Sequence, residues 1–306
     1  MKKVVVTGAC GFIGKALTIK LLQEGQKVYA VDVNKDLIDE LKLYGDVISI
    51  EASFEDYYNL HSSIRDEDID VFYHFAFHGS FGSESLKDYK IQLTNTIATC
   101  NAVMLAIKLK AKKFVFASSI NELEVKNYIN KDKIEPRFTC IYSAAKIACE
   151  IIGKTLAYNY GIEFVSGLIS MPFGYGNKAM TLPNILISKL NKNEVPKLVT
   201  GNNKYDLIYI DDVVNAFISI GEKGINQKSY YVGHRKLKTF REIVTDIRNI
   251  INPNIELVFG EYKDNLDMDY SLIDLDALYN DTGFECKADF KESILKTAEW
   301  VKMLDI

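Results

Sequence analysis

The stretch VVVTGACGFIG at residues 4–14 decides the fold, because an apolar run passes directly into glycines at positions 8, 11 and 14. Residues 4–6 are typical of a central strand of a parallel sheet that is apolar on both faces. From residue 12 to residue 22 the apolar side chains recur at helical spacing. The glycines therefore occupy a strand-to-helix turn. At such a turn the unpaired N–H groups and the positive end of the helix dipole favour a bound phosphate.

Each glycine of this turn has a separate task. Gly8 permits the tight turn, Gly11 lets a pyrophosphate approach the backbone, and Gly14 lets the helix pack closely on the strand. A second strand is expected over residues 27–31 and ends at Asp32, whose carboxylate can accept hydrogen bonds from both hydroxyls of an adenosine ribose. The same charge repels a 2′-phosphate, so the sequence favours NAD over NADP, although Lys35 lies close enough in sequence to soften that preference.

The overall composition is that of an ordinary globular protein. The 306 residues are 48% hydrophobic and 25% charged, with a net charge of -4. This balance gives no electrostatic reason to expect a nucleic acid or an anionic membrane as a partner, and no stretch approaches the ~20 apolar residues of a membrane helix. The five cysteines and four histidines show no metal-ligand spacing. We therefore expect reduced thiols, no bound metal and a cytoplasmic location.

Strand and helix patterns alternate over residues 1–170, which we expect to form an NAD-binding domain. Further strands are expected at 46–51, 70–76, 112–118 and 163–170, and helices at 35–43, 55–64, 86–109 and 139–160, with a loop over 122–137. This alternation predicts an α/β fold, a Rossmann-type doubly wound parallel sheet whose ligand crevice lies at the carboxyl ends of its strands. Gly8, Ala76 and Ser119 are expected to converge there.

Residues 171–306 are less regular and predict a smaller, mixed α/β substrate domain, with the chain returning to the first domain around 206–222. The expected elements are helices at 182–191, 239–251 and 290–303, a helix capped by Asp211 and Asp212 and running to Gly221, an extended run at 205–210 and a strand at 229–232. The glycine-rich segment 171–176 looks like a hinge. Because no long linker separates the two parts, we expect them to share a cleft.

Tyr142 and Lys146 supply the expected chemistry, since residues four apart on a helix project side by side. A phenol with its ordinary pKa of ~10 is a poor base, but a neighbouring ammonium stabilises the phenolate. The phenolate can then take the proton of a sugar or alcohol hydroxyl while nicotinamide takes the hydride. Ser119 is expected to hydrogen-bond the same oxygen and offset its developing charge. Phe75, Phe77 and Phe81 are candidates for the wall of the nicotinamide site or for core packing.

Taken together, these motifs resemble the extended short-chain dehydrogenase/reductase family, in particular its nucleotide-sugar epimerases, dehydratases and reductases. The motifs are TGACGFIG at 7–14, Asp32, HFA at 74–76, VFASS at 115–119, YSAAK at 142–146 and YIDDV at 209–213. The likeness covers nearly the whole chain, through a closing Gly283-Phe284 and Trp300.

The resemblance implies bound NAD, a catalytic centre of Tyr142, Lys146 and Ser119, and a nucleotide-sugar substrate held by the smaller domain. The implied cofactor contacts are Gly8, Cys10, Gly11, Phe12, Ile13, Gly14, Asp32, Ala76, Ser118, Tyr142, Lys146 and Pro172. The expected substrate contacts are His78, Asn177 and Lys204. Because family members commonly dimerise through two long helices, the resemblance also implies a homodimer formed by helices 86–109 and 139–160.

The chain departs from the family pattern at its substrate side. Dehydratases of the family place an Asp-Glu pair after the catalytic hydroxyl residue, whereas Ile120 and Asn121 follow here, which disfavours a 4,6-dehydratase. Tyr205 stands where many relatives have an arginine that grips the substrate diphosphate, and the usual arginine near residue 263 is also absent. Lys204, Lys236 or Lys263 can substitute, although a lysine does not offer the same bidentate fork.

Three functions fit these residues. The first is an NAD-dependent 4-epimerase, in which hydride leaves C4 of the sugar, the 4-keto sugar rotates and hydride returns to the other face. The second is a one-way keto-sugar reductase or sugar dehydrogenase that uses the same residues. The third is a non-catalytic NAD-binding regulatory protein on the same fold. The sequence favours the first, because a redox-neutral cycle suits a retained NAD.

Overall fold

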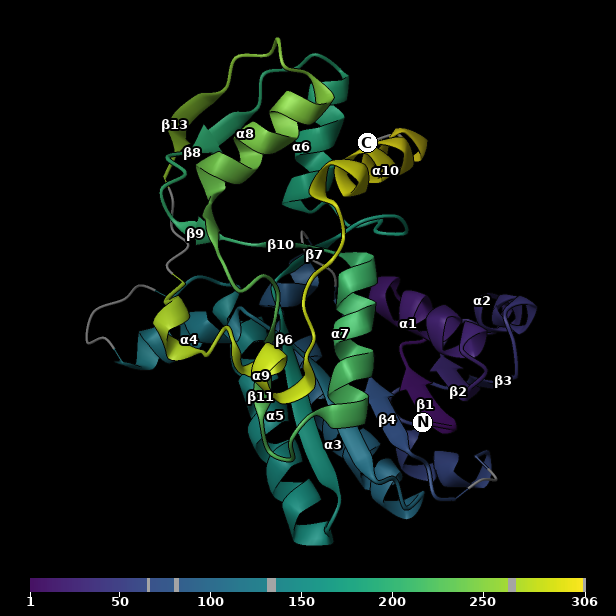
Figure 1. The fold of residues 1–306 in the computed structure, drawn as a ribbon. Coiled ribbons are helices and arrows are strands. Elements are labelled where there is room, and N and C mark those ends of the chain that lie inside the picture. The colour runs from purple at the N-terminus through teal and green to yellow at the C-terminus, as the bar shows by residue number, and fades with distance from the viewer. Residues whose placement is uncertain (65–66, 80–82, 131–135, 264–267, 305–306) are drawn as a thin grey trace.

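The computed structural model describes residues 1–64, 67–79, 83–130, 136–263 and 268–304 (Figure 1). Its centre is a sheet of seven strands in the order β11-β6-β5-β4-β1-β2-β3. The strands are β1 Lys3–Thr7, β2 Lys27–Asp32, β3 Val47–Glu51, β4 Val71–His74, β5 Lys113–Ser119, β6 Glu163–Ile169 and β11 Ser229–Val232. Every neighbouring pair is parallel. The order reverses between β1 and β4, so the ligand crevice of a doubly wound sheet belongs at the carboxyl ends of these two strands.

Both faces of the sheet are covered by helices, as the continuously apolar strands predict. Alternate residues of β1 face opposite sides of the sheet. Val4 and Val6 pack with helices α1 and α7, and Val5 packs with helices α3 and α5. The covering helices are α1 Phe12–Gln23, α3 Tyr89–Lys108, α5 Cys140–Tyr160 and α7 Ile210–Lys223, with the short α2 Lys35–Glu40 at the β3 edge. Helices α3 and α5 lie against each other along their length.

Two expectations for the connecting segments were wrong. The expected helix at 55–64 is the short 3-10 helix η2, Tyr57–Ser62. Residues 122–130, expected as part of a loop, form helix α4, Glu122–Asn130. The high charge of this segment hides its helical period, but Leu123 is fully buried against Tyr231 and Ile120, so tertiary packing stabilises the helix. The short helices η1 Leu41–Leu43, η3 Glu84–Lys87, η4 Tyr270–Leu272 and α9 Ala277–Thr282 complete the connections.

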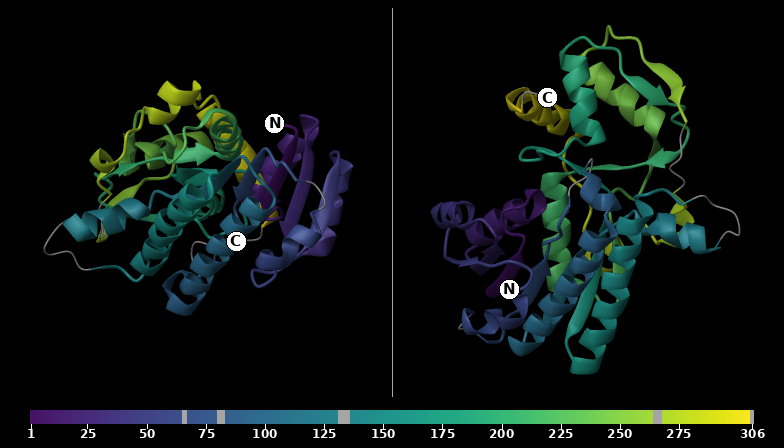
Figure 2. Two further views of the ribbon diagram at one scale, coloured as in Figure 1. Left: turned by 90° about the horizontal axis from the view of Figure 1, so that it is seen from below. Right: turned by 180° about the vertical axis from the view of Figure 1, so that it is seen from behind.

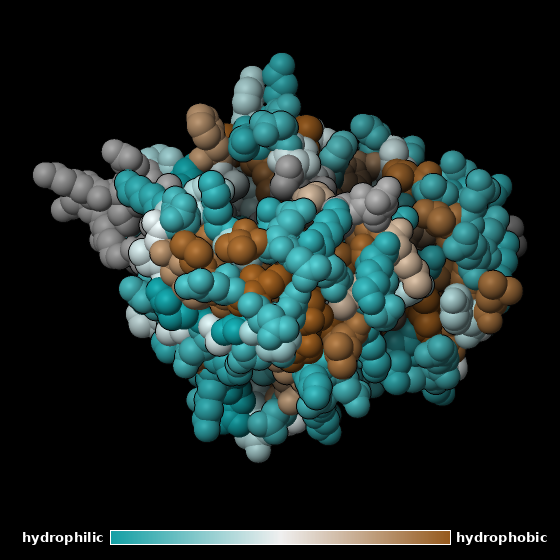
Figure 3. Space-filling view, turned by 90° about the horizontal axis from the view of Figure 1, so that it is seen from above, coloured by the Kyte–Doolittle hydropathy of each residue, from teal (hydrophilic) through white to brown (hydrophobic). Residues whose placement is uncertain are grey.

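An upper lobe stands over the carboxyl ends of the sheet strands (Figures 1 and 2). Helices α6 Leu182–Asn191, α8 Phe240–Ile251 and α10 Phe290–Met303 pack on one another there. Three small sheets accompany them: β7 Met171–Phe173 with β10 Leu207–Tyr209, β9 Lys204–Tyr205 with β12 Lys238–Thr239, and β8 Lys197–Val199 with β13 Val258–Tyr262. On the face seen from above, apolar side chains lie in small groups between hydrophilic ones (Figure 3).

Helix α7 starts differently from the expectation. Its N-cap residue is Tyr209, and the helix receives no side-chain cap. Instead, the carboxylate of Asp212 accepts hydrogen bonds from the backbone N–H groups of Lys287 and Ala288, both at 3.0 Å. Asp212 therefore ties α7 to the segment that leads into α10 of the upper lobe.

The glycine turn between β1 and α1 depends on two close contacts. Gly8 has a φ of +70°, and a Cβ there would lie 2.6 Å from the backbone nitrogen of Ala76. A Cβ on Gly14 would lie 2.0 Å from the carbonyl oxygen of Gly8. By contrast, a Cβ on Gly11 would approach only the same oxygen, at 3.3 Å. The turn thus needs glycine at 8 and 14 for packing, whereas Gly11 leaves its side of the turn open.

His74, the last residue of β4, links three elements beneath that turn. Its Nδ1 lies 2.7 Å from the hydroxyl of Thr7 on β1, and its Nε2 lies 3.1 Å from the hydroxyl of Thr99 on α3. A neutral imidazole satisfies both contacts, since it has one N–H donor and one acceptor nitrogen. Burial, together with the charge of Lys146, lowers the pKa of His74 to about 3. The ring is therefore a neutral structural brace.

Gly14→Ala is expected to lower the free energy of unfolding by about 1–3 kcal/mol, because the new Cβ forces α1 away from the turn. Gly11→Ala is the matched control, since its Cβ has room, and it is expected to cost about 1 kcal/mol or less. Chemical denaturation measures both. Equal stabilities of the two variants would contradict the assigned packing role of Gly14.

The free energy of unfolding is expected to fall as the pH drops from 6.5 toward 3, because the unfolded chain protonates His74 at its ordinary pKa while the native state does not. His74→Gln should reduce this slope by up to about 1.4 kcal/mol per pH unit. The control is His61→Gln, at an exposed histidine of η2. Denaturation at a series of pH values tests the expectation, and an unchanged slope in His74→Gln would show that the native ring takes up the proton.

Candidate active site

A cavity of about 830 Å³ opens at the carboxyl ends of β1, β2 and β4, against the glycine turn. We call it the turn cavity. Six of the residues expected to bind cofactor or substrate line it: Gly8, Cys10, Gly11, Asp32, Ala76 and His78. The parallel register explains this convergence, because Thr7 of β1 pairs with His74 of β4 and so brings the next residues of both strands to one edge.

Asp32 is held in a fixed direction at the rim of the turn cavity. Its Oδ2 accepts a hydrogen bond from the backbone N–H of Cys10 at 2.9 Å, and its Oδ1 accepts one from the N–H of Val33 at 2.8 Å. Each carboxylate oxygen has two lone pairs, so both retain the capacity to accept a further donor. The arrangement suits a ligand that presents a pair of hydroxyl groups.

A second cavity of about 300 Å³ lies between the sheet and the upper lobe, and we call it the inter-lobe cavity. Its lining includes three of the expected site residues: Phe12, Pro172 and Asn177. The Asn177 side chain supports its own segment, since its Oδ1 accepts a hydrogen bond from the N–H of Ala179 at 3.0 Å. Its backbone oxygen accepts the indole N–H of Trp300 at 2.8 Å, which fixes α10 to the cavity wall.

The structure brings the three expected catalytic side chains together at the end of β5. Tyr142, in the first turn of α5, shares a side-chain hydrogen bond with Ser119. The Nζ of Lys146, one turn further along α5, donates to the carbonyl oxygen of Ala117 at 2.8 Å and lies 5.9 Å from the centre of the Tyr142 ring. Tyr142 and Lys146 are 7% and 5% exposed. The phenol and the ammonium are thus neighbours in a site with little water.

Phe77 covers this pair from the side of the turn cavity, which it also lines. Its ring centre lies 3.6 Å from the Nζ of Lys146, a cation–π contact, and its ring meets that of Tyr142 edge-on at 5.6 Å. The backbone N–H and C=O of His78 are both held by the amide of Asn95, at 2.7 and 2.9 Å. Phe75 packs edge-on against Phe217 in the core, and Phe81 lies outside the described residues.

Burial opposes ionisation of the Tyr142 phenol, an effect that the sequence motif alone does not indicate. Burial raises the pKa of Tyr142 above its ordinary value, the hydrogen bond with Ser119 lowers it, and the charge of Glu122 raises it further. Burial also lowers the pKa of Lys146, to about 8. The physical reason is common to both groups: removal of water disfavours whichever form carries charge. The sequence motif places the ammonium beside the phenol but does not report how deeply both are buried.

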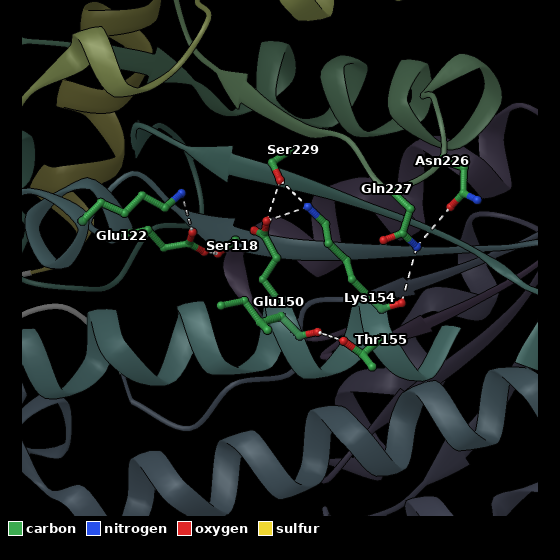
Figure 4. Close-up of polar contacts among 10 residues, drawn as sticks. Ser118, Glu122, Glu150, Lys154, Thr155, Asn226, Gln227 and Ser229 are labelled. Carbon is green, nitrogen blue, oxygen red and sulfur yellow. Dashed lines mark hydrogen bonds and ion pairs between the residues drawn. The ribbon is translucent and has the colours of Figure 1, made fainter. Parts of the chain in front are cut away.

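The remaining expected site residues do not line either cavity. Ile13 and Gly14 form the first turn of α1, and Lys204 is exposed on β9. The hydroxyl of Ser118 donates to the buried carboxylate of Glu122 (Figure 4). Sequence reasoning missed Glu122, because an acidic residue in a charged segment resembles a solvated one. Lys236 and Lys263 are exposed, and neither they nor Lys204 belong to the described lining of the inter-lobe cavity.

Asp206 is a further residue that the sequence did not single out. It lines the inter-lobe cavity, and its carboxylate accepts hydrogen bonds from the Tyr231 hydroxyl at 2.6 Å and the His234 backbone N–H at 2.8 Å. The Nδ1 of His234 lies 2.7 Å from the other oxygen, and this contact raises the pKa of His234. Asp206 therefore joins the segment after β9 to the loop after β11, at the wall of the cavity.

Within the described ranges, metal-binding side chains do not cluster and no helix suits a bilayer span. In this part of the chain, no group of three or more histidine, cysteine and carboxylate side chains could hold a metal ion. None of its helices combines the length and the apolar character that a bilayer span requires.

Comparison with known proteins places this arrangement in context. The chain is 26% identical to a dTDP-4-dehydro-6-deoxyglucose reductase of Escherichia coli, over 84% of each chain. Its fold is similar to that of a UDP-N-acetylglucosamine 4-epimerase of Methanobrevibacter ruminantium M1 in complex with UDP-N-acetylmuramic acid, with a TM-score of 0.80, 22% identity and coverage of 99% and 98% of the two chains. It is also similar to that of a UDP-glucuronic acid 4-epimerase of Bacillus cereus in complex with UDP-glucuronic acid and NAD, with a TM-score of 0.78, 18% identity and coverage of 99% of both.

A family model provides the assignment at the level of sequence. The model described as "NAD dependent epimerase/dehydratase family" matches residues 4–233, which is more than half of the chain and includes the glycine turn, β5, α5 and β11. The chain therefore belongs to the NAD-dependent epimerase/dehydratase family.

Proposed function

We propose that the protein is an NAD-dependent enzyme that acts on a nucleotide-linked sugar by reversible hydride transfer, and that it is a 4-epimerase. The observation that carries the proposal is the hydrogen-bonded Tyr142 and Ser119 beside Lys146, at the end of β5 in a sheet whose glycine turn borders a large cavity. The two solved 4-epimerases of similar fold support the choice of reaction.

The residues of the turn cavity fit a dinucleotide. The open side of Gly11 leaves room for a diphosphate at the N-terminus of α1, where unpaired N–H groups and the helix dipole favour negative charge. We propose that Asp32 receives the hydroxyls of the adenosine ribose, since its carboxylate is already fixed by Cys10 and Val33. When bound, NAD supplies the acceptor and donor of the hydride.

We assign the proton chemistry to this chain's own side chains. Tyr142 takes the proton of the sugar hydroxyl as the carbon is oxidised and returns it when the carbonyl is reduced. Ser119 holds the same oxygen in line, through the hydroxyl that already bonds the phenol. Lys146 supplies the positive charge that a buried phenolate needs, because burial alone raises the pKa of Tyr142.

The inter-lobe cavity is our proposed sugar site, which makes most of residues 171–306 the substrate domain. Ile120 and Asn121 line this cavity. They occupy the positions at which dehydratases of the family that the sequence resembles have an Asp-Glu pair. This difference supports epimerisation or simple reduction over dehydration. The 26% identical dTDP-4-dehydro-6-deoxyglucose reductase supports the second candidate, a keto-sugar reductase that uses the same three residues.

Tyr142→Phe tests the proposed function. The variant is expected to fold normally and to lose about 10²–10⁴-fold in kcat, since it lacks the proton that the phenol transfers. Tyr160→Phe is the matched control, because this tyrosine lies on the same helix but is exposed. Product analysis with UDP- and dTDP-sugars, together with the absorbance of the reduced cofactor, measures the reaction.

The same assay separates the candidate functions. A 4-epimerase interconverts the two sugars without net consumption of NADH, whereas stoichiometric loss of NADH would reject the epimerase in favour of the reductase. Unchanged turnover in Tyr142→Phe would reject the whole catalytic assignment.

We further propose that the protein forms a homodimer through α3 and α5. Helix α3 presents Tyr89, Leu93 and Ile97 at four-residue intervals, all more than half exposed. The adjacent α5 exposes Ile151 and Tyr158. Because α3 and α5 pack side by side, these exposed apolar side chains lie on two neighbouring helices. A contact of these helices with a second copy of the chain would remove the side chains from water.

Leu93→Glu combined with Ile97→Glu is expected to convert the protein to a monomer without unfolding it, because the charges would have to be buried at the interface. The control is Leu43→Glu, at an exposed leucine on η1. Sedimentation equilibrium measures the molecular mass. A monomeric parent protein, or a double variant that remains dimeric, would rule out this interface.

A further inference from the structure

The loop between β7 and α6, residues 174–181, forms part of the wall of the inter-lobe cavity, and we call it the wall loop. Its contribution to the lining is Asn177, Ala179, Met180 and Thr181. The wall loop also approaches α1, since a Cβ on Gly176 would lie 3.7 Å from the ring of Phe12, which lines the same cavity. The position of the wall loop therefore shapes the space between α1 and the upper lobe.

Two helices of the upper lobe hold the wall loop at one carbonyl oxygen, that of Asn177. From α10 the indole N–H of Trp300 donates to this oxygen at 2.8 Å, and from α6 the amide of Asn184 donates to it at 2.9 Å. A carbonyl oxygen has two lone pairs, so it can accept both bonds. The Asn184 amide also donates to the carbonyl oxygen of Ala179 at 2.9 Å. The wall loop is thus tied to α6 and α10, which pack on each other (Figure 1).

Trp300 makes a second contact with the wall loop through its ring. The ring centre lies 4.6 Å from that of Tyr175, with the two planes at 56°. Tyr175 stands between Gly174 and Gly176, whose φ angles are +136° and +92°. A backbone with two glycines in such conformations has many accessible alternatives, so contacts from outside the loop have to select one of them. Trp300 supplies two of these contacts, at residues 175 and 177.

The hydrogen bonds at the Asn177 carbonyl oxygen lie in a place with little water. The side chains of Asn177 and Asn184 are part of residues that are 4% and 0% exposed. A buried polar group that loses a hydrogen-bond partner is unfavourable, because water does not readily replace the lost bond. Removal of the Trp300 N–H is therefore expected to shift the wall loop, and with it one side of the inter-lobe cavity.

We propose that Trp300 is a positioning residue for the substrate: it holds the wall loop where the loop contacts the nucleotide-linked sugar, and Asn184 supports the same oxygen from α6. The inference rests on the proposed function, which places the sugar in the inter-lobe cavity. Trp300 acts through the wall loop and not through Tyr142. Its loss is thus expected to weaken substrate binding and to leave the proton chemistry intact.

Trp300→Phe tests the inference in the full-length protein with NAD, because it keeps a ring beside Tyr175 but lacks the indole N–H. For the UDP- or dTDP-sugar that the parent converts most efficiently, KM is expected to rise about 5–10-fold while kcat stays within about twofold of the parent value. Asn184→Leu removes the second donor and is expected to raise KM in the same way. The matched control is Glu299→Gln, at the neighbouring exposed residue of α10, whose carboxylate pairs with Lys302.

Two binding measurements do not depend on turnover. Trp300 is the single tryptophan of the chain, so its fluorescence in the parent protein reports on the wall loop and is expected to change when UDP or dTDP is added. Isothermal titration calorimetry gives the dissociation constant of the nucleotide that binds more tightly. This constant is expected to rise in Trp300→Phe and to stay at the parent value in Glu299→Gln.

The outcomes separate this inference from the proposed function. Parent values of KM and of the dissociation constant in Trp300→Phe would overturn the role of Trp300, even if Tyr142→Phe is inactive. A fall in kcat at constant KM would also overturn it, because that pattern belongs to the chemical step. Conversely, weaker nucleotide binding in Trp300→Phe together with a fully active Tyr142→Phe would uphold the role of Trp300 and reject the catalytic assignment. A parent protein that binds neither nucleotide would overturn both.

Discussion

The contact of Gly14 with the carbonyl oxygen of Gly8 is the constraint on which the rest of the site depends. It sets how closely α1 approaches the end of β1, and the positive φ of Gly8 then lets the backbone at Ala76 lie against the turn. Because all neighbouring strands of the sheet are parallel, the same edge also receives the ends of β2 and β5. The glycine contacts thus shape the wall of the turn cavity, and the parallel register brings Ser119 of β5 to the same edge of the sheet.

The buried position of Tyr142 and Lys146 makes the charged forms of both side chains unfavourable. A seven-stranded sheet covered on both faces excludes water from the first turns of α5, and this exclusion disfavours both the phenolate and the ammonium. The chain offsets the cost locally, with a hydrogen bond from Ser119, the carbonyl oxygen of Ala117 and the ring of Phe77. Strongly shifted pKa values in such a place are typical of functional sites as well as of structural ones, so the geometry and the family carry the assignment.

Local sequence patterns predicted the strands and helices whose burial leaves a regular spacing of apolar residues. The apolar strands of the central sheet and the helices at 182–191 and 290–303 were predicted correctly, since burial on both faces and amphipathic spacing leave clear patterns. Helix α4 was missed because the high charge of its segment hides the helical period, whereas the packing of Leu123 on Tyr231 stabilises it. The pairing of β8 with β13 joins segments about sixty residues apart, and no local pattern reports such contacts.

The same division holds for the site. The glycines, Asp32 and the Tyr142–Lys146 pair follow from motifs, whereas Glu122 and Asp206 gain their positions through the packing of α4 on α5 and through long-range hydrogen bonds. A crystal structure of the protein with NAD is the measurement that tests the central claim most directly. The account predicts a diphosphate at the N-terminus of α1, an adenosine ribose on Asp32 and a nicotinamide beside Tyr142. A dinucleotide bound elsewhere, or a nicotinamide far from that phenol, would contradict it.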